Sequence, residues 1–559
     1  MKIIPRPTRY YVLSITTLIL LLLNLYAVKA LIIFGSPILF ALALLVEVIL
    51  IGVFIYSLLR SLASPESVVK SLALSIRDGL ATNDYIKKLS KSKSPLLIWM
   101  KRRIKRNSPY GLALTLTLLI AVFFLVNFLT LLFAVSSKGS LTHVDTRVLN
   151  LIPSIRTPTQ TTFFRVVTTF ANVETFILLI VTMAVLLWRK HQRLLAGIVV
   201  GVAAGEESVT FIVKHLVHRM RPDHALSLIR ENGFSFPSGH ETRATVIFGL
   251  LAYVVYKTYS STRVRLVTIG SYVLIAFLVA VSRIYLGVHY PTDVWGSILL
   301  GGSMLTLVIG FLEIGSRYEV YGDKKLELSN KTISAVPAVL LAFALIASPS
   351  LVHIQPGVAT FAYTTLPTID EITVQKLPLY SETLTGSRME PINFIYVGYK
   401  NQIVSVFQSH GWYKADPSTL GNTLKALAVG FQGRQYLTAP VTPSYLNFKP
   451  EDLAFEQSTK SHSLRQRHHT RIWLTDYVLS DGRPIWVATA SFDEGIEFAG
   501  PAKLPTHHID SNIDAERLYI TKSLSLPNNL ISVVQPQLGK NASGDSFFTD
   551  GKAQLIKLK

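Results

Sequence analysis

The sequence lacks cysteine and carries little charge for its length. None of its 559 residues is cysteine, which excludes disulfides, thiolate metal sites, iron–sulfur clusters and a cysteine nucleophile. Charged residues make up 16% of the chain, whereas soluble proteins usually carry about 25%. Half of the residues are hydrophobic and the mean hydropathy is +0.40. This composition excludes a disordered chain and argues against a wholly soluble protein.

The net charge is strongly positive, at +21. In a membrane protein such an excess arises from cytoplasmic loops rich in Lys and Arg. A nucleic-acid partner would instead need a basic face on a soluble module, and the sequence holds no motif of that kind. We therefore predict membrane lipids, and no nucleic acid, as partners.

Nine apolar runs are long enough to span a bilayer as helices. Basic residues gather in the segments after the second, fourth, sixth and eighth runs, and at the N-terminus, so strict alternation places all of these in the cytoplasm. The first run continues as Leu31 to Phe34 without a polar start, which favours an uncleaved helix over a cleavable signal. Everything after Ser350 is then extracytoplasmic. The runs are residues 11–34, 37–59, 112–136, 170–188, 194–216, 239–257, 264–281, 293–313 and 332–349.

The predicted fold class is an all-α polytopic membrane protein followed by a soluble α+β extracytoplasmic domain. The tail alternates apolar and polar residues between Gly, Pro and Asp, which is typical of strands. Residues 138–169 are too polar to span and read as an amphipathic stretch on the outer surface. The predicted segments are a transmembrane hairpin (1–60), a basic cytoplasmic linker (61–111), a six-helix bundle (112–313), a loop with the last spanning helix (314–354) and the outer domain (355–559).

Three polar clusters fall at the ends of predicted spanning helices. They are Lys214 to Pro222, Phe236 to His240 and Ser282 to Asp293. Polar groups at such positions in a membrane protein indicate a functional site. The topology, which was obtained from hydropathy and loop charge alone, places all three clusters on the outer side.

The residue types in these clusters suit a phosphate group. Lys214 and Arg221 are seven residues apart, so on a helix they share one face. Arg283 adds a planar fork that matches phosphoryl oxygens. The turn Pro237–Gly239 lets backbone N–H groups approach an anion at a helix start.

Two histidines complete a catalytic set. His289 and Asp293 are four apart, so a helical turn brings the carboxylate onto one imidazole nitrogen and leaves the other free to attack phosphorus. His240, on another element, could protonate the leaving oxygen. The alternative is that these are ordinary polar residues at the membrane interface. No cluster suggests a magnesium or zinc site, so we predict no metal.

Other charged residues in this region read as structural. Glu207 shares the face of Lys214 and is predicted to pair with Arg243 or another cation, with a role in substrate choice as the alternative. Three further residues beside Lys214 are interpreted as solvated interfacial side chains: His215, His218 and Arg219.

The three clusters together resemble the tripartite motif of the type 2 phosphatidic acid phosphatase and vanadium haloperoxidase superfamily. The resemblance spans residues 112–313 and includes Asp145 and Arg156–Pro158. It implies phosphoester hydrolysis through a phosphohistidine, without metal or other cofactor. By it His289 is the nucleophile, Asp293 its partner and His240 the acid. The residues implied to bind phosphate are Lys214, Arg221, Ser238, Gly239 and Arg283.

The tail resembles the LssY-like C-terminal domain, which is found fused after phosphatases of this superfamily. The resemblance spans about residues 370–535 and rests on Arg467–Trp473, Gly482–Trp486, Ser491–Asp493 and Thr506–Asp510. Its histidines and nearby carboxylates could bind a metal. We favour a hydrogen-bonded structural network, because no ligand spacing is recognisable.

These observations predict an integral membrane phosphatase with an extracytoplasmic active site. Its expected substrate is a lipid phosphomonoester or pyrophosphate, such as phosphatidic acid, phosphatidylglycerol phosphate or polyprenyl pyrophosphate. The alternatives are a lipid phosphotransferase, a non-catalytic lipid-binding membrane protein, and a protein whose outer domain is the main active part.

Overall fold

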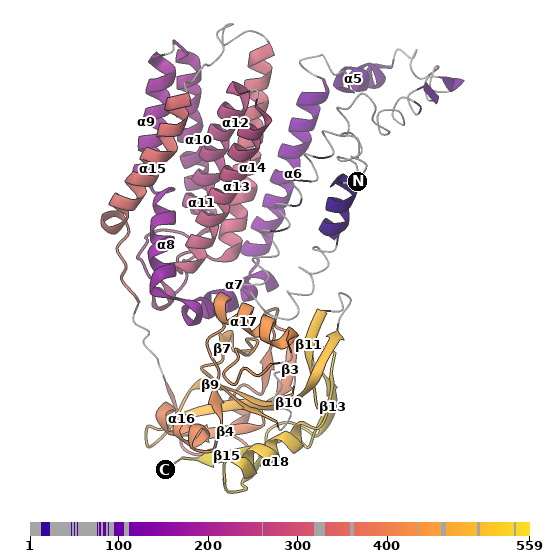
Figure 1. Cartoon of the computed structure of the whole chain (residues 1–559), viewed down its shortest axis with the longest axis vertical. Helices are drawn as coiled ribbons and strands as arrows, with labels where there is room; N and C mark the ends of the chain where they lie inside the picture. Colours follow the sequence, from indigo (N-terminus) through magenta and orange to yellow (C-terminus); the bar gives the residue numbers. More distant parts are fainter. Residues whose placement is uncertain are drawn as a thin grey trace. The chain divides into compact units, whose positions relative to one another are not determined.

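A computed structural model gives the structure of the chain (Figure 1). It describes residues 13–22, 94–104, 111–189, 191–259, 261–317, 330–357, 363–432, 434–459, 466–499, 504–541 and 544–558, with isolated positions between 46 and 88. The predicted hairpin 1–60 and linker 61–111 lie mostly outside these residues. The chain forms two compact units, Ala73–Asp145 with Arg156–Ala359, and Met1–Leu72 with Thr146–Ile155 and Thr360–Lys559.

The first unit is helical. Its first long helix, α6, exposes large apolar side chains on several sides, as a helix surrounded by lipid does. A cluster of buried apolar residues from α8, α9, α10, η3, α12, α13, α14 and α15 forms the core of the bundle. The helices from α5 to α15 are α5 (Pro95–Ile104), α6 (Leu112–Ser136), α7 (Ser140–Leu151), α8 (Pro158–Thr169), α9 (Val173–Arg189), α10 (Arg193–Val217), α11 (Gly239–Arg243), the π-helix η3 (Ala244–Phe248), α12 (Gly249–Thr258), α13 (Thr262–Tyr285), α14 (Pro291–Arg317) and α15 (Asn330–Leu351). The part of α7 after Asp145 is grouped with the second unit.

Four described helices are long and apolar enough to cross a membrane, namely Leu114–Ser136, Arg193–Val217, Thr262–Tyr285 and Pro291–Gly315. They coincide with four of the predicted spans. The predicted span 170–188 is one arm of a pair, α8 with α9, that meets the criteria together and bends by 41°. The predicted span 239–257 is helical throughout but is divided by η3. Nine spans stay a prediction, since the first two fall mostly outside the described residues.

The segment 138–169 differs from the single surface stretch that was predicted. It forms α7 and α8, joined by the 3₁₀ turn η1 (Ile152–Ile155). The C-terminal end of α8 is buried at Val167, Thr168 and Thr169, and α8 packs on α13 and α15. Charged residues such as Asp145 and Arg156 made the segment look too polar for burial, but they bind Arg219 and backbone carbonyls. The buried Thr168 and Thr169 satisfy their hydroxyls on Arg283 and within the helix.

The second unit is β-rich, as predicted for the tail. Its main sheet has the order β12 (Leu530–Ser532), β15 (Lys552–Lys557), β4 (Phe394–Val397), β10 (Pro484–Ala499), β9 (Arg467–Leu479), β8 (Leu453–Ser458), β5 (Tyr413–Lys414), with β1 (Thr364–Leu366) on β9 and β11 (Leu504–Ile509) on β10. Smaller sheets pair β13 (Gln537–Lys540) with β14 (Ser546–Thr549), and join β3 (Arg388–Pro391), β2 (Tyr380–Glu382), β6 (Tyr445–Leu446) and β7 (Lys449–Pro450).

Both faces of the main sheet are covered by apolar residues. Along β4, Phe394 and Tyr396 pack with residues of α16 (Lys400–Ser409) and α18 (Ile513–Ser523). Ile395 and Val397 alternate with them and join a second cluster that contains Trp473. A strand buried on both faces has apolar residues at every position, which explains the run in β4. A further helix of this unit, α17, covers Leu420–Phe431.

Candidate active site

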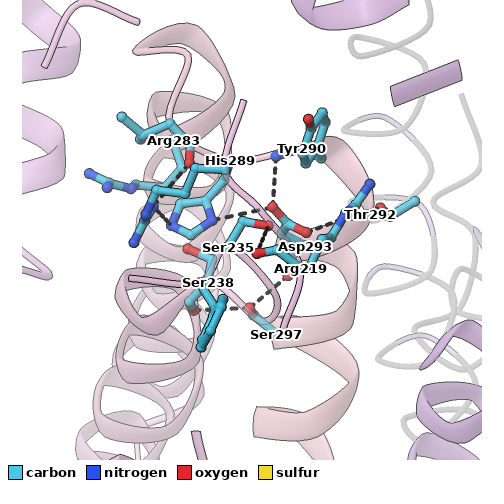
Figure 2. A network of polar contacts seen from close by, with 12 residues as sticks. Arg219, Ser235, Ser238, Arg283, His289, Tyr290, Thr292, Asp293 and Ser297 are labelled. Atoms are coloured by element: carbon cyan, nitrogen blue, oxygen red, sulfur yellow. Dashed lines mark hydrogen bonds and ion pairs between the residues drawn. The ribbon is translucent and has the colours of Figure 1, made fainter. Parts of the chain in front are cut away.

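The three motifs meet at one end of the helical bundle. The helices α10 and α13 end there, while α11 and α14 begin there. Figure 2 shows Ser238, Arg283, His289 and Asp293 converging from these elements. The prediction that the motifs lie on one side of the bundle is therefore confirmed by their positions in the fold.

His289 lies between a carboxylate and a guanidinium. Its Nδ1 is 3.4 Å from Asp293 Oδ2, and its Nε2 is 3.2 Å from Arg221 Nη1. A guanidinium can only donate, so Nε2 accepts and the ring proton is on Nδ1, facing Asp293. Burial, and after it the charges of Arg221 and Arg283, lower the pKa of His289 well below its ordinary value. The ring is therefore neutral at neutral pH, with an unprotonated Nε2.

A glycine lets the chain turn between Arg283 and His289. Gly287 has φ +76°, a conformation that side chains other than glycine rarely adopt. A Cβ atom at this position would come within 2.4 Å of the Leu226 carbonyl oxygen. The loop that carries His289 can therefore approach the loop after α10 only because residue 287 has no side chain.

Three cations of the predicted phosphate site are held by the loop that follows α10. Lys214 Nζ donates to the Phe234 carbonyl at 2.6 Å, and Arg221 Nε donates to that of Gly233 at 3.1 Å. Arg283 is fully buried and donates to Thr168 Oγ1 at 2.6 Å. The carboxylate of Glu231 pairs with both Arg221 and Arg283.

Ser238 and Gly239 form the turn into α11. Ser238 is fully buried, and its Oγ makes no hydrogen bond within the described part of the chain. Its carbonyl oxygen accepts from Ser297 Oγ at 2.9 Å, which ties the turn to α14 (Figure 2). An unsatisfied buried hydroxyl costs free energy, so this atom is suited to bind a polar ligand.

His240 begins α11 beside the predicted phosphate-binding residues. Its Nε2 is 2.8 Å from Oδ1 of Asn172, a residue that was not predicted to belong to the site. Because an amide oxygen accepts, this contact places a proton on His240 Nε2. Asn172 lies in the break between α8 and α9, where the chain carries no motif that marks it.

Arg219 is not the solvated residue that was predicted. Its guanidinium donates to Asp293 Oδ1 at 2.6 Å and to Asp145 Oδ2 at 2.7 Å, and it lies over the Tyr290 ring at 4.1 Å (Figure 2). α10 ends at Val217, and the next residue, His218, has φ +52°. The chain therefore leaves the helix direction just before Arg219. The neighbours His215 and His218 are exposed, as predicted.

Two residues of the α7–α8 region support the site from outside the motifs. Asp145 accepts from the Thr292 backbone N–H at 3.0 Å as well as from Arg219. Arg156 donates to the Leu226 carbonyl at 2.6 Å and to the Tyr285 carbonyl at 2.9 Å. These contacts hold the start of α14 and the two loops that carry the motifs.

The predicted partner of Glu207 is correct. Arg243 forms an ion pair with Glu207, and its Nη2 is 3.0 Å from Glu207 Oε2. This pair satisfies two charges within predicted membrane-spanning segments, where an isolated charge would be costly.

Within the described residues, no group of three His, Asp or Glu side chains could hold a metal ion. In the C-terminal unit the histidines bind carboxylates and arginines instead. His468 Nδ1 is 2.8 Å from Glu516 Oε2, and His469 Nδ1 is 3.4 Å from Asp493 Oδ1. Arg467 pairs with Glu456 and Asp493. This arrangement fits the favoured interpretation of a hydrogen-bonded network.

The residue that the sequence analysis missed at the centre of the site is Glu231. Between Arg221 and His240 the chain has two acidic residues, Asp223 and Glu231. An acidic residue so close in sequence to a predicted anion site is unusual and could have marked Glu231 as a member of the site. Nothing in the sequence spacing, however, shows that the Glu231 side chain points toward the arginines.

Comparison with known proteins supports two separate regions. Residues 193–314 match the family model described as PAP2 superfamily, and residues 374–553 match LssY C-terminus. Phosphatidylglycerophosphatase B of Bacillus subtilis is 42% identical over 109 residues, which are 19% of this chain and 53% of that protein. Decaprenylphosphoryl-5-phosphoribose phosphatase of Mycobacterium tuberculosis is 32% identical over 123 residues, 22% of this chain and 61% of that protein.

The chain thus spans between half and two thirds of the length of these curated relatives. A crystal structure of a PAP2-type phosphatidylglycerolphosphate phosphatase from Bacillus subtilis aligns with 35% of this chain and 96% of its own, at 28% identity and a TM-score of 0.33. The resemblance predicted from the motifs is confirmed: the chain carries a PAP2 superfamily region followed by an LssY C-terminus region.

Proposed function

We propose that this protein is an integral membrane lipid phosphatase that works through a phosphohistidine. The observation that carries the proposal is the environment of His289. Its Nδ1 proton faces Asp293, and its unprotonated Nε2 faces Arg221, with Arg283 close by. A nucleophile held by an orienting carboxylate and directed at cations is suited to phosphoryl transfer through a covalent intermediate.

The proposed reaction has two steps. His289 Nε2 attacks phosphorus in line and forms a P–N bond, while the P–O bond to the lipid breaks. His240 gives its proton to the departing lipid oxygen. In the second step His240 takes a proton from water, the resulting hydroxide attacks phosphorus, and the P–N bond breaks to release inorganic phosphate and neutral His289.

The cationic residues stabilise the charge that spreads over the phosphoryl oxygens. Lys214, Arg221 and Arg283 supply charge, while Ser238 and the backbone at Gly239 supply hydrogen-bond donors. The transition state of phosphoryl transfer is loose, so positioning and electrostatics account for most of the rate. No cofactor takes part in this scheme.

The proposed substrate is a lipid phosphomonoester or pyrophosphate. The named relatives act on a glycerophospholipid phosphate and on a prenyl-linked phosphate, so both classes are candidates. We further propose that the phosphate enters from the extracytoplasmic side, that residues 112–313 form the phosphatase domain, and that 355–559 form a separate outer domain. The bundle would keep the lipid chain between helices.

The test is phosphate release by the full chain, purified in detergent, from phosphatidic acid, phosphatidylglycerol phosphate and a polyprenyl pyrophosphate, with a chelator present. We expect release from at least one substrate. His289→Ala should lower kcat by about 10⁴-fold or more. The exposed His215→Ala is the matched control and should retain activity. Equal rates for wild type and His289→Ala would refute the mechanism, and so would loss of activity in chelator.

A further inference from the structure

The carboxylate of Glu231 stands where an anion would be expected. Its Oε2 is 3.1 Å from Arg221 Nη1, and its Oε1 pairs with Arg283 Nη2. The same Oε2 is 3.9 Å from His289 Nε2, the nitrogen proposed to attack phosphorus. Two arginines and the nucleophile therefore surround the carboxylate as they would surround a phosphoryl group.

The carboxyl group of Glu231 is ionised, and its cationic partners stabilise the negative charge. Burial acts to raise the pKa of Glu231, but the charges of Arg283 and its other cationic neighbours together outweigh burial, so this pKa lies below its ordinary value. About a fifth of the side chain is exposed, whereas Arg283 is fully buried. The side chain of Glu231 is thus more accessible to solvent than those of the two arginines that it binds.

The backbone carbonyl groups that follow Glu231 accept hydrogen bonds from other cationic side chains of the site. The carbonyls of Asn232, Gly233 and Phe234 accept from Arg221 and Lys214. Asn232 and Gly233 are exposed, and nothing lies within 4 Å of a Cβ built on Gly233. The segment Glu231–Phe234 therefore supplies acceptors to the cations that a phosphate would use.

Formal charge favours an exchange of Glu231 for phosphate. Lys214, Arg221 and Arg283 are positive, and Arg219 is outnumbered by its two carboxylates, Asp145 and Asp293. With Glu231 displaced, this set has an excess of two positive charges. A phosphomonoester carries about −1.5 to −2 at neutral pH, so it compensates the set better than one carboxylate does.

We propose that Glu231 is an internal competitor for the phosphate group, bound to Arg221 and Arg283 until a substrate displaces it. This inference rests on the proposed function and names a residue that sets substrate affinity. It implies that the affinity for any tetrahedral phosphate is lowered by the work of breaking the two Glu231 ion pairs. It also keeps two buried guanidinium groups paired when no substrate is present, which would otherwise be costly.

The experiment is calorimetric titration of the full chain in detergent with inorganic phosphate. Glu231→Gln keeps the size of the side chain and removes its charge. We expect its Kd for phosphate to be about tenfold lower than that of wild type, because one charge-assisted contact no longer competes. The control is Glu313→Gln, which removes a carboxylate 20 residues along α14 from Asp293.

A second variant guards against misfolding of the first. Glu231→Asp keeps the charge but shortens the side chain, so its carboxylate cannot reach both arginines and phosphate affinity should rise by less than in Glu231→Gln. Unchanged or weaker binding in both variants, or no phosphate binding by wild type and Glu231→Gln alike, would overturn the proposal. Tighter binding without lipid hydrolysis would leave it standing and refute the proposed function, whereas hydrolysis without tighter binding would do the reverse.

Discussion

Each of the two units contains a series of linked arginine, aspartate and histidine side chains, but the surroundings of the two series differ. In the helical unit, Asp145 and Asp293 hold Arg219, and Asp293 faces His289. In the β-rich unit, Glu456 and Asp493 hold Arg467, and Asp493 faces His469. The outer nitrogen of each histidine accepts from another arginine, at 3.2 Å from Arg221 and 3.0 Å from Arg471.

The difference lies in the charge beyond the histidine. His289 meets Arg221, next to Arg283 and Lys214, and a displaceable carboxylate balances them. In the β-rich unit, the charge of Arg471 acts on the partly buried acid Glu451, and Arg467 is matched by two carboxylates of its own. A buried His–Asp–Arg chain is therefore not evidence of catalysis by itself. An excess of cations at the free imidazole nitrogen is what distinguishes a site that needs an anion.

The largest predicted effect concerns the stability of the β-rich unit when the arginine of its network is replaced. Arg467→Met leaves Glu456 and Asp493 buried without their cation, and should lower the free energy of unfolding of this unit by about 3–5 kcal/mol. Urea unfolding followed by tryptophan emission measures it, because the three buried tryptophans, Trp412, Trp473 and Trp486, all lie in this unit.

The matched control for Arg467 is Arg483→Met. Arg483 forms an exposed pair with Asp481 at 2.7 Å, which is worth about 0–1 kcal/mol. Equal effects of the two substitutions would show that the Arg467 network does not hold the sheet together.

The next effect is on turnover in the helical unit. Arg219→Gln removes the cation that holds Asp293, so His289 loses its orientation, and kcat should fall by about 10–100-fold. KM should change little, because Arg219 contacts the orienting carboxylates and not the proposed phosphate position. Arg219→Lys should recover part of kcat. A raised KM with unchanged kcat would instead place Arg219 among the residues that bind substrate; the exposed His215→Ala is the control.

The smallest effect is a shift in pH dependence. The reaction needs neutral His289, and a lowered pKa keeps the ring neutral as pH falls through 6.5. The acid limb of kcat/KM should therefore lie below pH 6.5. Burial, and then Arg471, also lower the pKa of His469, yet His469→Gln should leave the profile unchanged. An acid limb above pH 6.5, or one that moves with His469→Gln, would contradict the assignment.

Local spacing predicted one contact of the site correctly. His289 and Asp293 contact each other because they are one helical turn apart, and this distance is visible in the sequence. Arg219 was misread because its partner Asp145 lies 74 residues earlier in the chain. Glu231 and Asn172 were missed for the same reason: a loop residue shows its inward orientation only when the opposite elements are in place.

The tail shows the same limit at the level of strands. Alternating residues predicted strands near Ile472 and Pro484, and both lie in the hairpin of β9 and β10. The parallel pairing of β15 with β4 was not predictable, because Leu555 and Ile395 are far apart in sequence and no local pattern encodes strand order.

The contacts of Arg156 determine how much of the chain would be needed to transfer this site to another protein. One guanidinium joins the backbone after α10 to the backbone that ends α13, yet it lies outside the three motifs and outside residues 193–314. If only the motifs were transferred to another helical bundle, the Arg156 hydrogen bonds would be missing, and the two loops would no longer be held together. The smallest unit that could be transferred is longer than the motifs: it includes Asp145 in α7 and Arg156 between η1 and α8.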